Sequence, residues 1–387
     1  MILDTHYLIL IIKKKYMKRT INLLFIGVTL MLMLLVSCNP IVQPPPPEKA
    51  ETVTSFYLLN EGTWGANNAS IDFYDYQTQD YQRNFFTTIN PDIVGGLGDV
   101  GNDLQIYGNK LYAVINASGL VEVMNAKTAK HIGKISIANC RNIAFDGKYA
   151  YVTSFAGELL PDNTQLGFVA KIDTATLQIV GRVDVGFQPE GLAAANGKLY
   201  VANSGGYNAP NYDNRLSVID IQSFTEIKKI VVAPNLKRVE RDNYGNIYVL
   251  SVGNYEDILP KIYKIDTQND VVSGNINAAA SNFCISGDSV YIIYNEDINW
   301  ATYTTITSVY IYNLHTQQFV NQSVIKDGTQ MQFPHNIAVN HITKEIFITD
   351  MKNCVVLGEL FCFSPDGEKL WSLTTGVIPN KIVFMSE

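Results

Sequence analysis

From residue 53 to its end, the chain alternates short apolar runs with polar turns in a pattern that recurs seven times. Each copy holds a short alternating strand, a variable loop, a second strand that ends near Asp or Asn, a tight turn and a third strand. The copies span residues 55–85, 109–135, 148–183, 197–230, 245–276, 288–323 and 344–373. A further apolar segment, such as DLQIYG, NIAFDG or NFCISG, precedes most of them. Four strands per unit at a period of about 45 residues predict a β-propeller.

The two ends of this repeat indicate how the propeller closes. The first copy lacks its leading strand, and the chain ends with an unpaired apolar segment, NKIVFMSE, at 380–387. We therefore predict an all-β, seven-bladed β-propeller with four-stranded blades, in which the C-terminal strand closes the first blade. This closure removes a sheet edge that would invite aggregation. One or two β-sandwiches would also give many short strands, but seven copies and an orphan terminal strand favour the propeller.

Residues 1–52 differ in composition from the repeats. A basic start, a long apolar stretch and the segment LVSC (35–38) follow one another in the order of a secretory signal. The LVSC segment resembles a bacterial lipobox, which implies that Cys38 carries the lipids and becomes the mature N-terminus. We predict a signal peptide over 1–37 with its true start at Met17, a lipidated cysteine and proline-rich linker over 38–52, and the propeller over 53–387.

The apolar stretch also approaches the length of a transmembrane helix. A cysteine directly after a small residue and the proline-rich spacer that follows favour the lipoprotein instead. Asn39 replaces the Asp that often retains such lipoproteins at the inner membrane, so we expect an outer-membrane location. Several acyl chains would anchor the protein stably, and the polyproline spacer would hold the propeller away from the bilayer.

Charge and cysteine content narrow the classes of ligand. The chain has 29 basic and 36 acidic residues, and removal of residues 1–37 leaves 24 basic and 35 acidic ones. Such an acidic surface argues against nucleic acid as a partner. No CxxC motif or Cys/His cluster indicates a zinc site. Cys140 and Cys284 occupy apolar strand positions and are expected to be buried thiols, whereas spacing leaves open whether Cys354 and Cys362 form a disulfide.

The loops between the second and third strands of each blade are long and rich in aromatic residues. The turns between the first and second strands, such as YGN, DGK and SGD, are tight by comparison. The aromatic residues in the long loops are Trp64, Phe155, Tyr207, Tyr212, Tyr255, Trp300 and Tyr303. Exposed rings with interspersed Asn and Asp on one face would suit a large, partly apolar ligand with a polar edge. Alternatively, each ring packs on a neighbouring blade and anchors its loop.

The starts of the leading strands are expected on the same face, near the central channel. Alignment of these strands places Asn102, Arg141, Glu190, Lys237, Asn282, His335 and Asn380 at equivalent positions. They would form a mixed polar ring at the channel mouth, with ordinary channel hydration as the alternative role. His335 stands out because a neutral imidazole can bind a metal or exchange protons near neutral pH.

Catalytic motifs give little support for an enzyme. The sequence has neither a Gly-x-Ser-x-Gly elbow nor an HExxH zinc motif. Oxygen-rich loops such as NYDN and YNEDIN do not follow the pattern of an EF-hand, and we interpret them as solvated loops. We therefore predict a protein that is not an enzyme and that has no metal site and no cofactor.

The repeats, with YVANSGG and LSVIDIQ as clear examples, resemble the YVTN-type (YncE-like) propeller repeats of bacterial surface proteins. Together with the lipobox, the proline spacer and the opening LLNEGTWGANNASIDFYD, they resemble the BtuG-like surface lipoproteins of gut bacteria. That resemblance implies a seven-bladed propeller that captures cobalamin (vitamin B12) outside the cell. It also implies transfer of the corrinoid to a TonB-dependent outer-membrane transporter of the BtuB type.

A corrinoid is a broad ring edged with amide side chains, and the polar residues of the long loops suit its edge. The tryptophans and tyrosines of the loops could cover apolar edges, and five asparagines could pair with the amides: Asn67, Asn68, Asn208, Asn211 and Asn299. Two other functions remain open. One is a surface propeller that binds a glycan or a peptide in a different uptake system, and the other is a propeller enzyme such as a lactonase or a lyase.

Overall fold

The computed structural model describes residues 4–34, 51–157 and 165–387. The chain divides into two compact units, Met1–Ala50 and Glu51–Glu387. In the first unit, residues Asp4–Leu34 form the helix α1. No helix in the described part of the chain is long and apolar enough to cross a membrane. The predicted lipidation site, Cys38, lies outside the described residues.

The second unit is a β-propeller, and the described residues 51–157 and 165–387 form its seven four-stranded antiparallel sheets. This confirms the predicted fold. Blade 1 contains β28 (Pro379–Ser386), β1 (Val53–Asn60), β2 (Ser70–Asp75) and β3 (Asp80–Gln82). Blade 2 contains β4 (Gly101–Tyr107), β5 (Lys110–Ile115), β6 (Leu120–Asn125) and β7 (His131–Ser136). Blade 3 contains β8 (Cys140–Asp146), β9 (Tyr149–Ser154), β10 (Phe168–Asp173) and β11 (Ile179–Asp184).

The other four blades continue in chain order, and the short helix α2 (Phe85–Ile89) lies between blades 1 and 2 in sequence. Blade 4 contains β12 (Pro189–Ala195), β13 (Lys198–Asn203), β14 (Arg215–Asp220) and β15 (Thr225–Val231); blade 5 contains β16 (Leu236–Arg241), β17 (Ile247–Ser251), β18 (Lys261–Asp266) and β19 (Val271–Ala279). Blade 6 contains β20 (Asn282–Ser286), β21 (Ser289–Asn299), β22 (Thr304–Asn313) and β23 (Gln318–Asn321); blade 7 contains β24 (Pro334–Val339), β25 (Ile346–Asp350), β26 (Leu357–Phe363) and β27 (Lys369–Val377).

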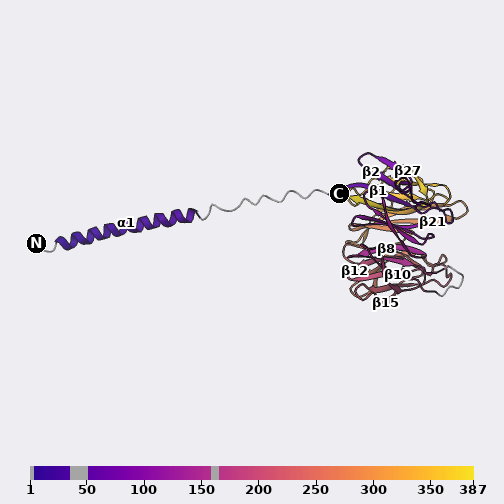
Figure 1. The fold of residues 1–387 in the computed structure, drawn as a ribbon, viewed down its shortest axis with the longest axis horizontal. Coiled ribbons are helices and arrows are strands. Elements are labelled where there is room, and N and C mark those ends of the chain that lie inside the picture. The colour runs from indigo at the N-terminus through magenta and orange to yellow at the C-terminus, as the bar shows by residue number, and fades with distance from the viewer. Residues whose placement is uncertain (1–3, 35–50, 158–164) are drawn as a thin grey trace. The chain divides into compact units, whose positions relative to one another are not determined.

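The ring closes through blade 1, as the orphan C-terminal segment predicts. Strand β28 pairs antiparallel with β1, with Phe56 opposite Phe384. Beyond this pair, the backbones of Thr52 and Glu387 exchange two hydrogen bonds of 3.1 and 3.0 Å. In Figure 1 the indigo β1 and β2 lie beside yellow segments from the end of the chain. The first and last strands of the propeller therefore stabilise each other directly.

The apolar core lies between neighbouring blades. Tyr57 and Leu59 of blade 1 pack with Leu104 and Leu111 of blade 2 in one buried cluster. Because each blade is covered on both faces, five of the six residues of β5 are fully buried and its sequence, KLYAVI, is nearly all apolar. The outermost strands lack this cover, and β11 alternates between half-buried and exposed residues. This difference explains why the inner strands have the strongest apolar signal in the sequence.

The Asp or Asn at the end of the third strand has a local structural role. In blade 1, the Asp75 carboxylate accepts hydrogen bonds from the backbone N–H groups of Gln77 and Thr78, at 2.8 and 2.9 Å. Equivalent bonds form at Asn125, Asp173 and Asn313. A side-chain oxygen that satisfies two turn N–H groups favours a tight turn at this position. The recurring acid or amide is therefore a turn signal.

The cysteines of the propeller are structural. Cys140, Cys284, Cys354 and Cys362 are all free thiols. Cys140 and Cys284 are buried, as predicted, and burial raises the pKa of both. A raised pKa keeps a thiol protonated and unreactive. The disulfide that the sequence left open, between Cys354 and Cys362, does not form.

Candidate functional site

A cavity of about 1370 Å³ opens where the innermost strands of the blades converge. Its lining includes residues from all seven blades, and it exceeds the range of about 300–1000 Å³ typical of small-molecule sites. All seven ring positions expected from the sequence line this cavity: Asn102, Arg141, Glu190, Lys237, Asn282, His335 and Asn380. We call these residues and their charged neighbours the floor of the cavity.

Most of the ring positions lie at β-bulges near the starts of the innermost strands, and Asn282 of β20 lies in a regular ladder. Six of the seven innermost strands in the described propeller shift register within their first residues. In β16, for example, the shift between Leu236 and Val239 leaves Lys237 and Arg238 out of the regular ladder. A bulge changes the direction of its side chains, so two consecutive residues can both face the cavity. Lys237 and Arg238 both line it.

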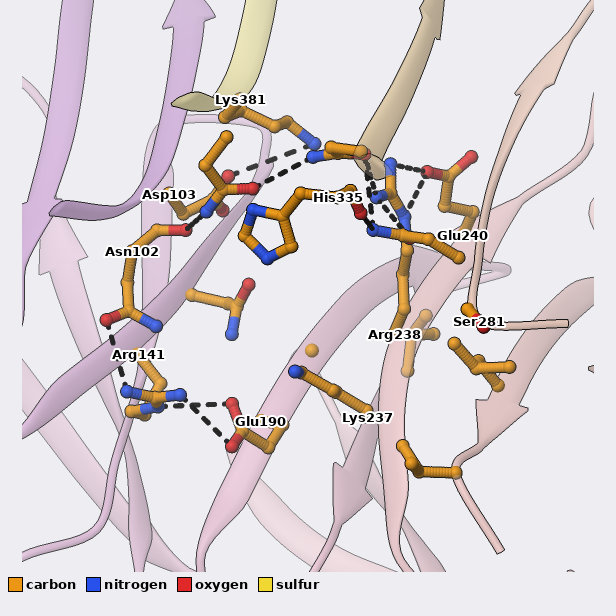
Figure 2. A pocket seen from close by; sticks show the side chains of 18 of the residues that line it. Asn102, Asp103, Arg141, Glu190, Lys237, Arg238, Glu240, Ser281, His335 and Lys381 are labelled. Atoms are coloured by element: carbon orange, nitrogen blue, oxygen red, sulfur yellow. Dashed lines mark hydrogen bonds and ion pairs between the residues drawn. The ribbon is translucent and has the colours of Figure 1, made fainter. Parts of the chain in front are cut away.

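On one side of the floor, Arg141 and Glu190 form a bidentate salt bridge between blades 3 and 4. The Nε and Nη2 atoms of Arg141 donate to the two carboxylate oxygens of Glu190, at 3.1 and 3.2 Å. Its Nη1 donates to Asn102 Oδ1 at 3.1 Å (Figure 2). Burial opposes the charge of Arg141, but Glu190 outweighs this effect and raises the pKa of the arginine. The guanidinium also lies 4.7 Å from the centre of the Phe155 ring.

On the opposite side, Arg238 connects blades 5, 6 and 7. Its Nε donates to Glu240 at 2.8 Å, and its Nη1 donates to the amide oxygens of Asn282 and Asn336, at 2.8 and 2.9 Å. Asn336 in turn donates to Asn380 at 2.9 Å. Sequence alignment missed Arg238, Glu240 and Asn336. The register of the strands predicts one inward residue at each start, and the bulges supply Arg238 and Asn336 as second ones. Glu240 lies in the regular ladder two residues after Arg238.

His335 lies beside this network. Its Nδ1 is 3.4 Å from the Pro379 carbonyl oxygen, which can only accept, and its Nε2 is 3.9 Å from the Glu61 carboxylate. Burial lowers the pKa of His335, Glu61 opposes that effect, and the positive charge of Lys237 adds to the lowering. The imidazole is therefore neutral near pH 7. Asn380 donates to Glu61 at 2.7 Å and holds that carboxylate in place.

The chemistry of the floor is that of binding through hydrogen bonds and charge. Near the ring, the cations Arg141, Lys237, Arg238 and Lys381 face the carboxylates Glu61, Asp103, Glu190 and Glu240. Other charged residues also line the cavity: Arg241 at the far end of β16, and Glu256, Glu296 and Asp297. Burial raises the pKa of Asp103, while Lys381 and backbone N–H groups act in the opposite direction. Among the described residues, no group of three or more His, Cys, Asp or Glu side chains could hold a metal ion.

One wall of the cavity is aromatic and aliphatic. Tyr255 and Trp300 line it from the long loops of blades 5 and 6, with 71% and 61% of their surfaces exposed. The Trp300 ring lies 5.6 Å from the Phe333 ring, and Ile258 and Leu259 extend the apolar surface. The sequence did not single out Phe333, although it lies two residues before His335. We call this wall and the long loops around it the rim.

The other predicted aromatic residues divide into three kinds. Phe155 is buried beneath Arg141, with 3% of its surface exposed. The ring centroids of Tyr212 and Tyr303 are 6.3 Å from those of Tyr255 and Trp300, respectively, so these two rings contact the wall. Trp64 and Tyr207 are exposed and are not among the described residues that line the cavity. The seven predicted rings therefore do not form one shared aromatic face. Two line the cavity, two contact those, one is in the core, and two are exposed outside the cavity lining.

Three of the predicted asparagines, Asn67, Asn68 and Asn208, form hydrogen bonds within the protein. Asn68 Oδ1 accepts the Thr63 N–H at 2.8 Å, and Asn67 donates to the Gly95 carbonyl at 3.0 Å. Asn208 accepts from the Gln188 side chain at 3.3 Å. These amides shape the loops from which the exposed rings project, and the cavity is lined by other residues.

Solved structures with similar folds include two propeller-containing proteins. A Kuenenia stuttgartiensis hydrazine synthase matches with a TM-score of 0.54 and 16% identity over 67% of this chain and 74% of that one. A quinonprotein alcohol dehydrogenase-like protein from Bacteroides thetaiotaomicron matches with a TM-score of 0.56 and 14% identity over 86% and 78% of the two chains. At such low identity these similarities show the fold alone. A search of curated proteins found no match.

A family model matches residues 54–368, which is most of the propeller and well over half of the chain. The match begins in β1 and ends near the start of β27, so it includes strands of every blade. It therefore covers nearly all of the cavity floor. The chain belongs to the family described as domain of unknown function DUF5074.

Proposed function

We propose that this protein is an outer-membrane surface lipoprotein that captures corrinoids such as cobalamin and passes them to a TonB-dependent transporter. The observation that carries the proposal is the cavity of about 1370 Å³, which combines a polar floor with an apolar wall on one side. A corrinoid has the matching character, because amide side chains surround a broad macrocycle. The resemblance of the lipobox, the spacer and the NEGTWG opening to BtuG-like lipoproteins supports the same ligand class.

The bonding of the floor supports tight capture. Arg141 and Arg238 each hold fixed partners from neighbouring blades, so the donors and acceptors keep their positions before any ligand arrives. A prearranged site lowers the ordering cost of binding. The side-chain NH2 group of Asn102 makes no hydrogen bond with the described residues, and Asn380 Oδ1 accepts only one. Both can then complete hydrogen bonds with the ligand's amides. The proposed membrane anchor is Cys38.

A second candidate function rests on the two exposed rings outside the cavity. Trp64 exposes 80% of its surface and Tyr207 exposes 67%. Flat exposed aromatic rings on one protein stack readily on sugar rings or peptide side chains. A propeller that binds a glycan or a peptide through these rings is therefore the alternative to corrinoid capture.

Titration of the propeller, residues 51–387, with cyanocobalamin and with cobinamide tests the proposal. This fragment is a compact unit that contains both strands of the closing pair. We expect submicromolar binding to both corrinoids, measured by calorimetry or by the change in corrinoid absorbance. A porphyrin without amide side chains serves as the control macrocycle and should bind far more weakly. No binding of either corrinoid at high micromolar concentration would refute the proposal and favour the second candidate.

A further inference from the structure

We infer that Lys237 forms an anion subsite within the cavity, which takes one phosphate or carboxylate group of the bound ligand. The inference deepens the proposed function and rests on it for its main test. A complete cobalamin carries one such group, the phosphodiester of its nucleotide loop. Cobinamide has the same corrin ring without that group.

The other cations of the floor are already matched by carboxylates of the protein. The pairs are Arg141 with Glu190, Arg238 with Glu240, and Lys381 with Asp103. Both guanidinium groups also donate to asparagine side chains. The two arginines have therefore committed both their charge and most of their donors within the protein, and Lys381 lies 3.9 Å from a carboxylate.

Lys237 differs from these three cations. It lies in the bulge of β16 and is exposed within the cavity, and its ammonium group makes no hydrogen bond or ion pair with any residue that the structure describes. Figure 2 shows its Nζ directed towards the middle of the floor, between Glu190 and His335, with no bond drawn to it. Among the seven ring positions, all of which are described, Lys237 is the one whose side chain has no such bond.

The surroundings of Lys237 make an anion the suitable partner. Its nearest acidic ring neighbour, Glu190, has both oxygens occupied by Arg141. Its charge acts on His335, whose pKa it helps to lower. An ammonium group in a partly enclosed site gains more from a charged acceptor than from a neutral one, because attraction between opposite charges adds to the hydrogen bond. Arg241 also lines the cavity without such a bond to the described residues, but it lies at the far end of β16, four residues after Lys237. Among the described residues, Lys237 is therefore the unpaired cation at the ring, and an anion is expected to bind there.

The test compares the corrinoid affinities of two variants of the propeller fragment, residues 51–387: Lys237→Met and, as the control, Lys130→Met. Methionine keeps much of the length of lysine without its charge, and Lys130 is exposed and is not a cavity residue. We expect Lys237→Met to weaken cyanocobalamin binding about 10- to 100-fold, the range for a lost hydrogen bond to a charged group. The affinity of Lys237→Met for cobinamide should change less than about twofold. The affinities of Lys130→Met for cyanocobalamin and for cobinamide should also change less than about twofold. Added salt should reduce the difference in cyanocobalamin affinity between the unaltered protein and Lys237→Met.

An equal loss for the two corrinoids, or no loss for either, would overturn the anion subsite while the corrinoid function stands. If the unaltered protein binds neither corrinoid, the proposed function fails and the subsite is tested separately. Inorganic phosphate and acetate are then titrated while the ring-proton NMR signals of His335 are followed, with His335→Gln used for assignment. A shift that is present in the unaltered protein and lost in Lys237→Met supports the subsite, and identical behaviour of the two proteins overturns it.

Discussion

The floor and the rim of the cavity are built in opposite ways. In the floor, Arg141 and Arg238 each bond to side chains from neighbouring blades. In the rim, Tyr255 and Trp300 leave 71% and 61% of their surfaces exposed. The floor therefore has its geometry before a ligand binds, whereas exposed rings can change rotamer at little cost. If the protein binds a ligand as proposed, this difference predicts that the floor selects ligand chemistry and that the rim adjusts to ligand shape.

The largest effect on stability is expected where one of the long loops contributes a side chain to the core. Phe155 belongs to a long loop by sequence but is buried beneath Arg141. Phe155→Ala should lower the free energy of unfolding by about 3–5 kcal/mol, because it removes a buried ring and leaves a cavity. Trp64→Ala, in the corresponding loop of blade 1, should change it by less than about 0.5 kcal/mol. Denaturant unfolding of both variants checks this, and equal effects would contradict the distinction between core and exposed rings.

A somewhat smaller effect is expected from breaking the floor network. Arg141→Met leaves Glu190 without its partner at a largely buried position, which should cost about 2–3 kcal/mol of stability. The matched control is Lys127→Met, which breaks the exposed pair with Glu387 and should cost less than about 1 kcal/mol. The double variant Arg141→Met with Glu190→Gln should recover part of the loss. If it recovers none, the two side chains do not act as a pair.

The smallest effect is a change in the pH dependence of stability. Burial lowers the pKa of His335 below its usual value of about 6.5. As the pH falls below that value, the unfolded chain takes up a proton that the folded chain resists, so acidification destabilises the fold. His335→Gln should remove this contribution, which is at most about 1.4 kcal/mol per pH unit. Thermal unfolding between pH 7 and pH 5 measures it.

The control for that experiment is His315→Gln, which removes one imidazole from the exposed turn after β22. Parallel pH profiles for the unaltered protein and His335→Gln would show that the floor does not resist protonation of His335. A flatter profile for His335→Gln alone supports the electrostatic description of the floor.

Local sequence patterns were sufficient to predict the architecture. Repeated apolar strands gave the number of blades, and the unpaired segment at 380–387 predicted the closing strand that β28 now provides. The pattern also identified Cys140 and Cys284 as buried thiols. These predictions succeed because strand periodicity and burial of apolar residues are properties of short segments, and each blade repeats them.

The site was predictable only in part. Alignment placed the seven ring positions at the cavity, but it missed Arg238 and Asn336 because bulges add a second inward residue. It grouped the loop aromatics together, whereas Tyr255 and Trp300 line the cavity and Phe155 is buried. Loop conformation depends on contacts with other blades, and strand periodicity carries no information about those contacts.

The sequence by itself determined the number of blades, the closure of the ring and the Asp or Asn turns, because each arises from interactions between neighbouring residues or from a simple repeat. Only the tertiary structure decided which charges are paired. Arg141 and Glu190 are 49 residues apart, and Arg238 and Asn336 are 98 apart. Such pairs form when separate blades are brought side by side around the channel. The same assembly leaves Lys237 without a partner among the described residues, and that unpaired charge is a property of the assembled ring.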